Sequence, residues 1–179
     1  MPPADVTFDP SEASIASEDA RMPEILIDPE PPDLDATPDG PPAIVVGVDG
    51  SVSSVAALRY AAGLAPALSL PLHALAVWDY PTFVYGGFYP TLDWSPLDDA
   101  KRILNHVVEE VFGDSPPSWL TSRTRRGRPA EVLIAESSHA EIVVLGSRGH
   151  GGFAGLLLGS VSAACAEHGH CPVLVVHGR

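Results

Sequence analysis

The sequence predicts an α/β domain, an open and doubly wound five-stranded parallel sheet with helices on both faces. The first observation is that strand-like runs alternate with helical segments five times between residues 43 and 179. The second is that runs such as Ile142–Leu145 and Val173–Val176 are short, β-branched and uncharged, as buried strands are. Regular alternation of this kind indicates parallel strands joined by right-handed crossovers.

The elements follow one another in order along the chain. The first strand is predicted at about 43–48, and an alanine-rich helix from about Ser53 to Leu68 follows it. Ser95-Pro96 has the pattern of an N-cap followed by proline at the first helical position. The helix that begins there repeats apolar residues every 3.6 positions, at Leu97, Ala100, Leu104, Val107, Val108 and Val111. The other predicted elements are strands at about 72–78, 118–124, 141–145 and 173–176, a helix at about 129–138 and a short helix after Gly159.

Residues 1–42 differ in composition from the rest of the chain. They hold 11 acidic residues, one basic residue and 10 of the 19 prolines, whereas the remaining residues hold 12 acids and 9 bases. Such a segment cannot bury enough apolar surface to offset the entropy of ordering. We therefore expect a disordered acidic, proline-rich arm over 1–42 and one domain over 43–179. The apolar patch Ile25–Ile27 could dock on a partner or on its own domain, but the interpretation that we favour is a solubilising acidic arm with no fixed contact.

Composition also excludes several classes of protein. The first residues lack the basic and apolar regions of a signal peptide, and no run approaches 18 apolar residues. The net charge of −13 argues against general binding to nucleic acid or to an anionic membrane. Two cysteines make no disulfide framework. The expectation is a soluble cytoplasmic protein with no nucleic-acid or membrane partner.

A glycine motif near the carboxyl end carries the strongest functional signal. Gly146-Ser-Arg-Gly149 is followed by nine residues and then by Gly159-Ser160. Glycines after a buried strand let backbone N–H groups approach an anion with no Cβ in the way. Gly159-Ser160 begins a short helix, and a helix N-terminus has unpaired N–H donors and a partial positive charge. The motif predicts a phosphate-binding turn.

Two other glycine motifs fit this segment poorly. Residues 149–154 match the spacing of the dinucleotide fingerprint, but the acidic residue that it requires about 20 positions later would fall in the apolar last strand. A P-loop requires a lysine, and the only lysine of the chain, Lys101, is far from any glycine loop. Phosphoryl transfer of the P-loop type is therefore not expected.

The residues quoted above resemble the universal stress protein family, in its form with an ATP-binding motif. The resemblance rests on the segment from Glu141 through the glycine motif to Val176, on Ile44-Val-Val-Gly-Val-Asp49-Gly-Ser51, and on Arg126-Gly-Arg-Pro-Ala130 with Ile134. It covers about residues 43–179. It implies the strand order 3-2-1-4-5, with the switch point between strands one and four. Ligands of open parallel sheets bind at such a point, which would bring Asp49 and the Gly146 loop face to face.

The resemblance also implies roles for individual residues. Asp49 and the backbone of Val77 would contact adenine, while the glycines of the motif, Ser160 and Ser162 would hold ribose and phosphates. Arg148 and His150 could add positive charge. A helix cap at Asp49, a turn without ligand at the glycines and a solvated loop tip at Arg148 and His150 stay open as alternatives. The predicted nucleotide-binding residues are Val48, Asp49, Val77, Gly146, Ser147, Arg148, Gly149, His150, Gly159, Ser160, Val161 and Ser162, with no catalytic residue and no metal ligand.

The function implied is that of a stress-response or regulatory module that binds ATP, alone or with Mg²⁺, and hydrolyses it slowly at most. A homodimer through strand 173–176 is expected, because an uncharged edge strand would otherwise be an aggregation hazard. One alternative is a protein-interaction scaffold without nucleotide. Another is an enzyme that cleaves ATP between the α and β phosphates, although Val48–Ser53 departs from the SGGxDS loop of those enzymes.

Three further features have competing interpretations. Cys165, His168, His170 and Cys171 lie close in sequence, and helix packing explains them better than a metal site does. Arg123, Arg125, Arg126 and Arg128 favour protection of an edge strand by charge. The segment from Trp78 to Trp94 holds seven of the 12 aromatic residues. It is long for a connection, which leaves a lid, a docking surface and packing on its own domain as alternatives.

Overall fold

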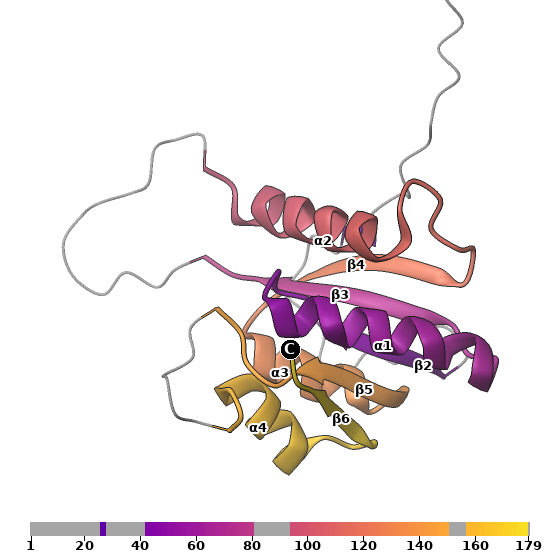
Figure 1. Cartoon of the computed structure of the whole chain (residues 1–179). Helices are drawn as coiled ribbons and strands as arrows, with labels where there is room; N and C mark the ends of the chain where they lie inside the picture. Colours follow the sequence, from indigo (N-terminus) through magenta and orange to yellow (C-terminus); the bar gives the residue numbers. More distant parts are fainter. Residues whose placement is uncertain (1–25, 28–41, 81–93, 151–156, 179) are drawn as a thin grey trace, which may run out of the picture.

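The computed structural model describes residues 26–27, 42–80, 94–150 and 157–178, and Figure 1 shows their arrangement. The predicted disorder of the arm and most of the aromatic segment 78–94 lie outside these residues. The elements in chain order are β1 (Leu26–Ile27), β2 (Ala43–Gly47), α1 (Val52–Leu68), β3 (Leu72–Trp78), α2 (Pro96–Phe112), β4 (Leu120–Arg126), α3 (Pro129–Ser137), β5 (Ala140–Gly146), α4 (Ser160–His168) and β6 (Val173–Val176). No helix in these described ranges has the length and hydropathy of a membrane span.

All strands of the sheet are parallel, in the order β1-β4-β3-β2-β5-β6. The five longer strands, β4-β3-β2-β5-β6, have the order 3-2-1-4-5 when they are numbered among themselves. This confirms the predicted fold class and strand order. The order reverses between β2 and β5, so the carboxyl ends of these two strands form the switch point.

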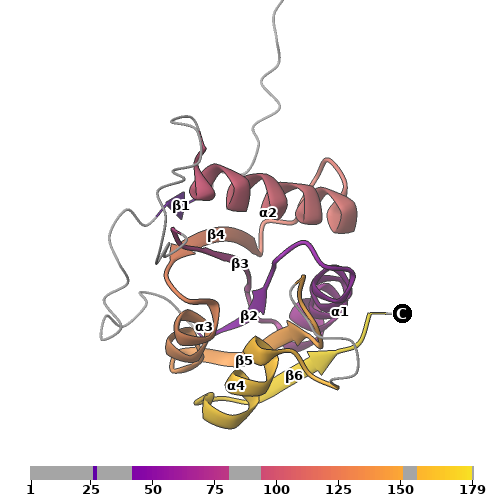
Figure 2. The same ribbon diagram turned by 90° about the vertical axis from the view of Figure 1, so that its left-hand side faces the viewer.

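Helices cover both faces of the sheet, with α1 and α2 on one face and α3 and α4 on the other (Figure 2). Strand β2 shows how the pleat divides the core, because Ile44 and Val46 belong to the α1/α2 side while Val45 belongs to the α3/α4 side. The first side is the larger core, and Leu58 of α1 and Leu104 of α2 are completely buried in it. The second side contains Leu75, Leu133 and Leu145, and the leucines at its carboxyl edge also line a cavity.

The helix starts follow the local sequence. Ser51 caps α1, since its side chain accepts a hydrogen bond from the Ser54 amide. Ser95 caps α2 in the same way through the Asp98 amide, and Pro96 occupies the first turn, which confirms that prediction. Strand β4 begins at Leu120 instead of about 118. The Leu120 amide donates to the Pro117 carbonyl at 3.0 Å, so a turn holds the preceding residues out of the strand.

The two-residue strand β1 extends the sheet beyond β4, which the sequence pattern did not predict as a strand. Leu26 is in register with Arg123, and Ile27 with Thr124. Leu26 and Ile27 therefore pair with their own domain, whereas the interpretation favoured from the sequence was an arm with no fixed contact.

The arginines of β4 are paired with acidic residues of the domain. Arg123 and Arg125 both reach Glu136 of α3, at 3.7 and 3.0 Å, and Glu136 is buried. Arg126 lies 3.5 Å from Asp79 and stacks over the rings of Trp78 and Tyr80. Because β1 covers part of this edge and the side chains tie β4 to α3 and β3, these ion pairs explain the basic stretch more directly than edge protection does.

Candidate functional site

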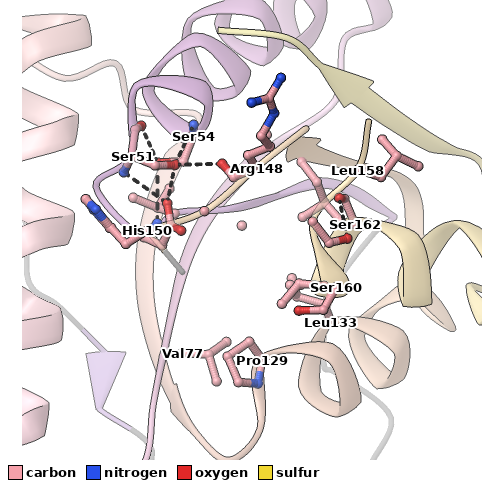
Figure 3. A pocket seen from close by; sticks show the side chains of 18 of the residues that line it. Ser51, Ser54, Val77, Pro129, Leu133, Arg148, His150, Leu158, Ser160 and Ser162 are labelled. Atoms are coloured by element: carbon pink, nitrogen blue, oxygen red, sulfur yellow. Dashed lines mark hydrogen bonds between the residues drawn. The ribbon is translucent and has the colours of Figure 1, made fainter. Parts of the chain in front are cut away.

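A cavity of about 460 Å³ lies at the switch point, between the carboxyl ends of β2 and β5 and the beginnings of α3 and α4 (Figure 3). This volume falls in the range of small-molecule sites. Its lining comes from segments that are far apart in sequence: Gly47, Val48, Asp49, Ser51, Ser54, Leu75, Val77, Pro129, Leu133, Leu145, Gly146, Arg148, Gly149, His150, Leu158, Gly159, Ser160, Val161 and Ser162.

Eleven of the twelve residues predicted for nucleotide binding line this cavity. The exception is Ser147, which is 4% exposed. Its amide donates to the Val176 carbonyl at 2.7 Å, and its carbonyl accepts a hydrogen bond from the Gly159 amide. Sequence reasoning missed eight lining residues. Strand alternation from Val77 could have found Leu75, and helical spacing from Pro129 could have found Leu133. The others are Gly47, Ser51, Ser54, Pro129, Leu145 and Leu158.

Asp49 lies beside the glycine loop at the rim of the cavity, as the predicted strand order requires. Its Oδ1 accepts hydrogen bonds from the Ser51 amide at 3.0 Å and from the Ser51 hydroxyl at 2.6 Å. A Cβ added to Gly149 would overlap Asp49 Oδ2, so the carboxylate lies directly against the loop. Ser51 is the N-cap of α1, and Asp49 orients this capping residue through both hydrogen bonds.

The glycine loop is packed on the first turn of α1. A Cβ on Gly146 would come within 2.7 Å of the Ser53 carbonyl carbon and 2.8 Å of the Ser54 amide nitrogen. Only glycine lets β5 end this close to the helix. The space around Gly159 is different, because a Cβ there would meet Arg148 Cα at 3.5 Å and the Gly149 nitrogen at 3.7 Å, which are ordinary contacts. Gly146 is thus needed for packing, whereas Gly159 borders open cavity.

The start of α4 supplies hydrogen-bond donors at this end of the cavity. Gly159 is the N-cap, with no side chain to accept hydrogen bonds from the first turn, and Ser160 is exposed. Ser162 lines the cavity but is 3% exposed. Its hydroxyl donates to the carbonyls of Gly159 at 3.1 Å and Ser147 at 3.3 Å. Ser162 therefore stabilises the loop in this structure, where the sequence analysis expected it to donate to a phosphate.

The opposite end of the cavity is apolar. Leu75 and Val77 of β3, Pro129 and Leu133 of α3, and Leu145 of β5 line it. Gly47 belongs to the same wall, since a Cβ there would come within 2.7 Å of a Leu145 methyl group. The cavity therefore joins an apolar slot to a rim formed by the glycine loop and the first turn of α4, and the Asp49 carboxylate lies against that loop.

Arg148 and His150 lie on the rim and both are exposed. Figure 3 shows the guanidinium of Arg148 pointing away from Ser160 and Pro129, out of the cavity. His150 lies beside Gly50, whose Cβ position is 3.5 Å from the His150 Nε2 atom. This arrangement fits the interpretation of both side chains as a solvated loop tip.

The cysteines and histidines near the carboxyl end do not gather into a metal site. Across the ranges that the structure describes, no group of three or more His, Cys, Asp or Glu side chains is placed to hold a metal ion. Cys165 is 1% exposed in the α3/α4 core, and burial raises the pKa of its thiol to about 11. Burial also raises the pKa of the Cys171 thiol. Cys165 is thus a packing residue.

Comparison with known proteins shows the family to which the chain belongs. The family model described as universal stress protein family matches residues 42–177. A universal stress protein of Mycolicibacterium smegmatis is 35% identical over 141 residues, covering 76% of this chain and 46% of that protein. One of Mycobacterium tuberculosis is 35% identical over 133 residues, covering 74% of this chain and 44% of that protein. The chain spans about half the length of the curated relatives it matches.

Solved structures agree in fold. A universal stress protein in complex with cAMP has a TM-score of 0.58 and 27% identity, covering 77% of this chain and 98% of that chain. Universal stress protein UspA from Lactobacillus plantarum has a TM-score of 0.57 and 23% identity, covering 75% and 97%. With the strand order, the cavity at the switch point and the family model in agreement, the chain belongs to the universal stress protein family.

Proposed function

We propose that this chain binds an adenine nucleotide in the switch-point cavity and acts as a stress-response or regulatory module. The observation that carries the proposal is the division of the cavity into an apolar slot and a rim formed by the glycine loop and the N-terminus of α4. A nucleotide has the matching division into a flat base and an anionic phosphate. The 27% identical structure in complex with cAMP supports an adenine nucleotide as the class of ligand.

In our proposal each part of the ligand has its own region of the cavity. The base would lie between Val77 and Leu133, where the walls are apolar. Asp49 is an acceptor for a ribose hydroxyl or an exocyclic amine, and its orientation is already held by Ser51. The phosphates fit at Gly149 and Gly159, where backbone approach is possible and the N-terminus of α4 favours negative charge.

ATP is the specific ligand that we propose, with hydrolysis that is slow at most. Asp49 is the one carboxylate among the lining residues, and its Oδ1 is engaged by Ser51. A single carboxylate is no cage for Mg²⁺, so the ion would enter on the phosphates of the nucleotide. The remaining titratable lining residues, Arg148 and His150, lie on the exposed rim. This arrangement favours binding over rapid phosphoryl transfer.

We also propose that the chain forms a homodimer through β6. Each residue of Val173–Val176 is partly exposed. Among the described strands, β6 pairs with β5 on one side and lies at the end of the sheet. Pairing with a second copy would cover the apolar edge. The cytoplasmic location expected from the sequence stays a prediction.

Thermal unfolding with a panel of ligands tests the proposed ligand class. ATP, AMP, cyclic AMP and GTP are each added to protein shown to carry no retained nucleotide. A ligand at 100 times its Kd stabilises the folded state by about 2.7 kcal/mol, which raises the Tm by a few degrees. We expect this shift with adenine nucleotides and a smaller one with GTP. No shift with any ligand would support the scaffold alternative.

A further inference from the structure

Two serine hydroxyls at the start of α1 converge on one carbonyl of the glycine loop. The Ser53 hydroxyl donates to the Arg148 carbonyl, and the Ser51 Oγ lies 3.2 Å from the same oxygen (Figure 3 shows Ser51 and Arg148). The single hydroxyl proton of Ser51 is already directed to Asp49, at 2.6 Å. Ser53 is therefore the residue that supplies the proton to the Arg148 carbonyl. Ser53 does not line the cavity and is not one of the residues proposed to bind the nucleotide.

The orientation of this carbonyl decides where the next amide points. A trans peptide is planar, so the N–H of Gly149 points opposite to the C=O of Arg148. With the carbonyl directed at Ser53, the Gly149 amide is directed away from α1. The Gly149 nitrogen accordingly lies 3.7 Å from the Cβ position of Gly159, on the rim of the cavity. Rotation of this peptide by half a turn would place a carbonyl oxygen, which repels an anion, where the donor now stands.

Packing holds Ser53 in place from two sides. Gly146 lies so close that a Cβ there would come within 2.7 Å of the Ser53 backbone. Gly178, which follows β6, approaches from another direction, with its Cβ position 3.0 Å from the Ser53 Cα and nitrogen. Ser53 itself is 7% exposed. The position of Ser53 is therefore held by packing, and its hydroxyl can orient the Arg148–Gly149 peptide.

We propose that Ser53 is a positioning residue that holds the Arg148–Gly149 peptide with its N–H toward the phosphate of the bound ligand. The inference rests on the proposed function and deepens it, because it names a residue that acts on the phosphate part alone. The chemical class recognised is a phosphate or phosphoanhydride group. The nucleoside part is held by the apolar slot and Asp49, which Ser53 does not touch.

The test is the substitution Ser53→Ala, with Ser137→Ala as the matched control. Ser137 is also a buried serine whose hydroxyl donates to a backbone carbonyl, that of Ile134, but it does not line the cavity. Calorimetric titration gives the Kd of the wild type and of both variants for ATP, AMP and adenosine. A hydrogen bond to a charged group corresponds to roughly a 10- to 100-fold change in affinity. We expect Ser53→Ala to lose about that factor for ATP and AMP and less than about threefold for adenosine, while Ser137→Ala keeps all three affinities.

The outcomes separate this proposal from the proposed function. Equal losses for adenosine and ATP, or no loss for either, would overturn the role of Ser53 and leave the nucleotide site intact. If the wild type binds none of the three ligands, the proposed function fails. The unliganded NMR spectrum then decides about Ser53: a Gly149 amide resonance that moves in Ser53→Ala but not in Ser137→Ala supports the positioning, and an unmoved resonance overturns it.

Discussion

Glycines that belong to one sequence motif have different physical reasons for being glycine. Gly146 faces the backbone of α1 at distances that no Cβ tolerates, whereas the Cβ position of Gly159 has ordinary contacts and its φ of −73° suits any residue. The motif spacing alone does not distinguish the two. The structure therefore separates a glycine needed for folding from a glycine that keeps the cavity open.

This difference predicts different stabilities for two alanine variants. Gly146→Ala forces Ser53 and Ser54 to move, and overpacking of this kind costs about 1–3 kcal/mol of unfolding free energy. Gly159→Ala changes only an N-cap and should cost less than about 1 kcal/mol. Urea denaturation of both variants and the wild type measures the difference. Equal loss in both variants would show that the assignment of Gly146 to packing is wrong.

Most of the residues predicted for the site line one cavity, because motif spacing and resemblance identify positions along a chain. Eleven of the twelve predicted residues line the cavity. The hydroxyl of Ser162 and the contact of Ser53 with Arg148 could not be predicted. They depend on which rotamer a side chain adopts and on a contact between segments 95 residues apart, and no local pattern encodes either.

Elements were predictable where one periodic signal extends over many residues. The apolar stripe and cap of α2 and the β-branched run of β6 gave their types and nearly all of their bounds. Strand β4 was placed about two residues early, because a turn after Pro117 delays it. Strand β1 was missed as a strand because two residues carry no periodicity, and its pairing exists only through the edge of β4.

The pairing of β1 with β4 gives a prediction at the scale of elements. Replacing both Leu26 and Ile27 by proline removes the backbone donors of β1. Hydrogen exchange should then become faster at amides near Arg123 and Thr124, the register partners of β1, while β2 stays protected. The matched control places prolines at Ser14 and Ile15, elsewhere in the same arm. Unchanged exchange in β4 would mean that β1 does not protect this edge in solution.

At the scale of the whole molecule, we propose that a second copy of the chain pairs with the outer edge of β6. Val175 belongs to this strand and to neither of the two buried clusters, so Val175→Lys should block strand pairing at little cost to the core. Sedimentation at micromolar concentration should show a dimer for the wild type and a monomer for this variant. Tyr60→Lys, on the exposed side of α1, is the control and should stay dimeric. A monomeric wild type would contradict the dimer.

The central claim is that the switch-point cavity binds an adenine nucleotide through the rim formed by the glycine loop and the first turn of α4. Calorimetric titration of ATP into the wild type and into Gly159→Ala tests it most directly, because the added methyl group would lie 3.7 Å from the Gly149 nitrogen, where we propose that the phosphate binds. We predict one site per chain in the wild type and at least a roughly tenfold weaker affinity in the variant, with the fold retained. Equal affinities in the two proteins would contradict the site, and no binding by the nucleotide-free wild type would contradict the function.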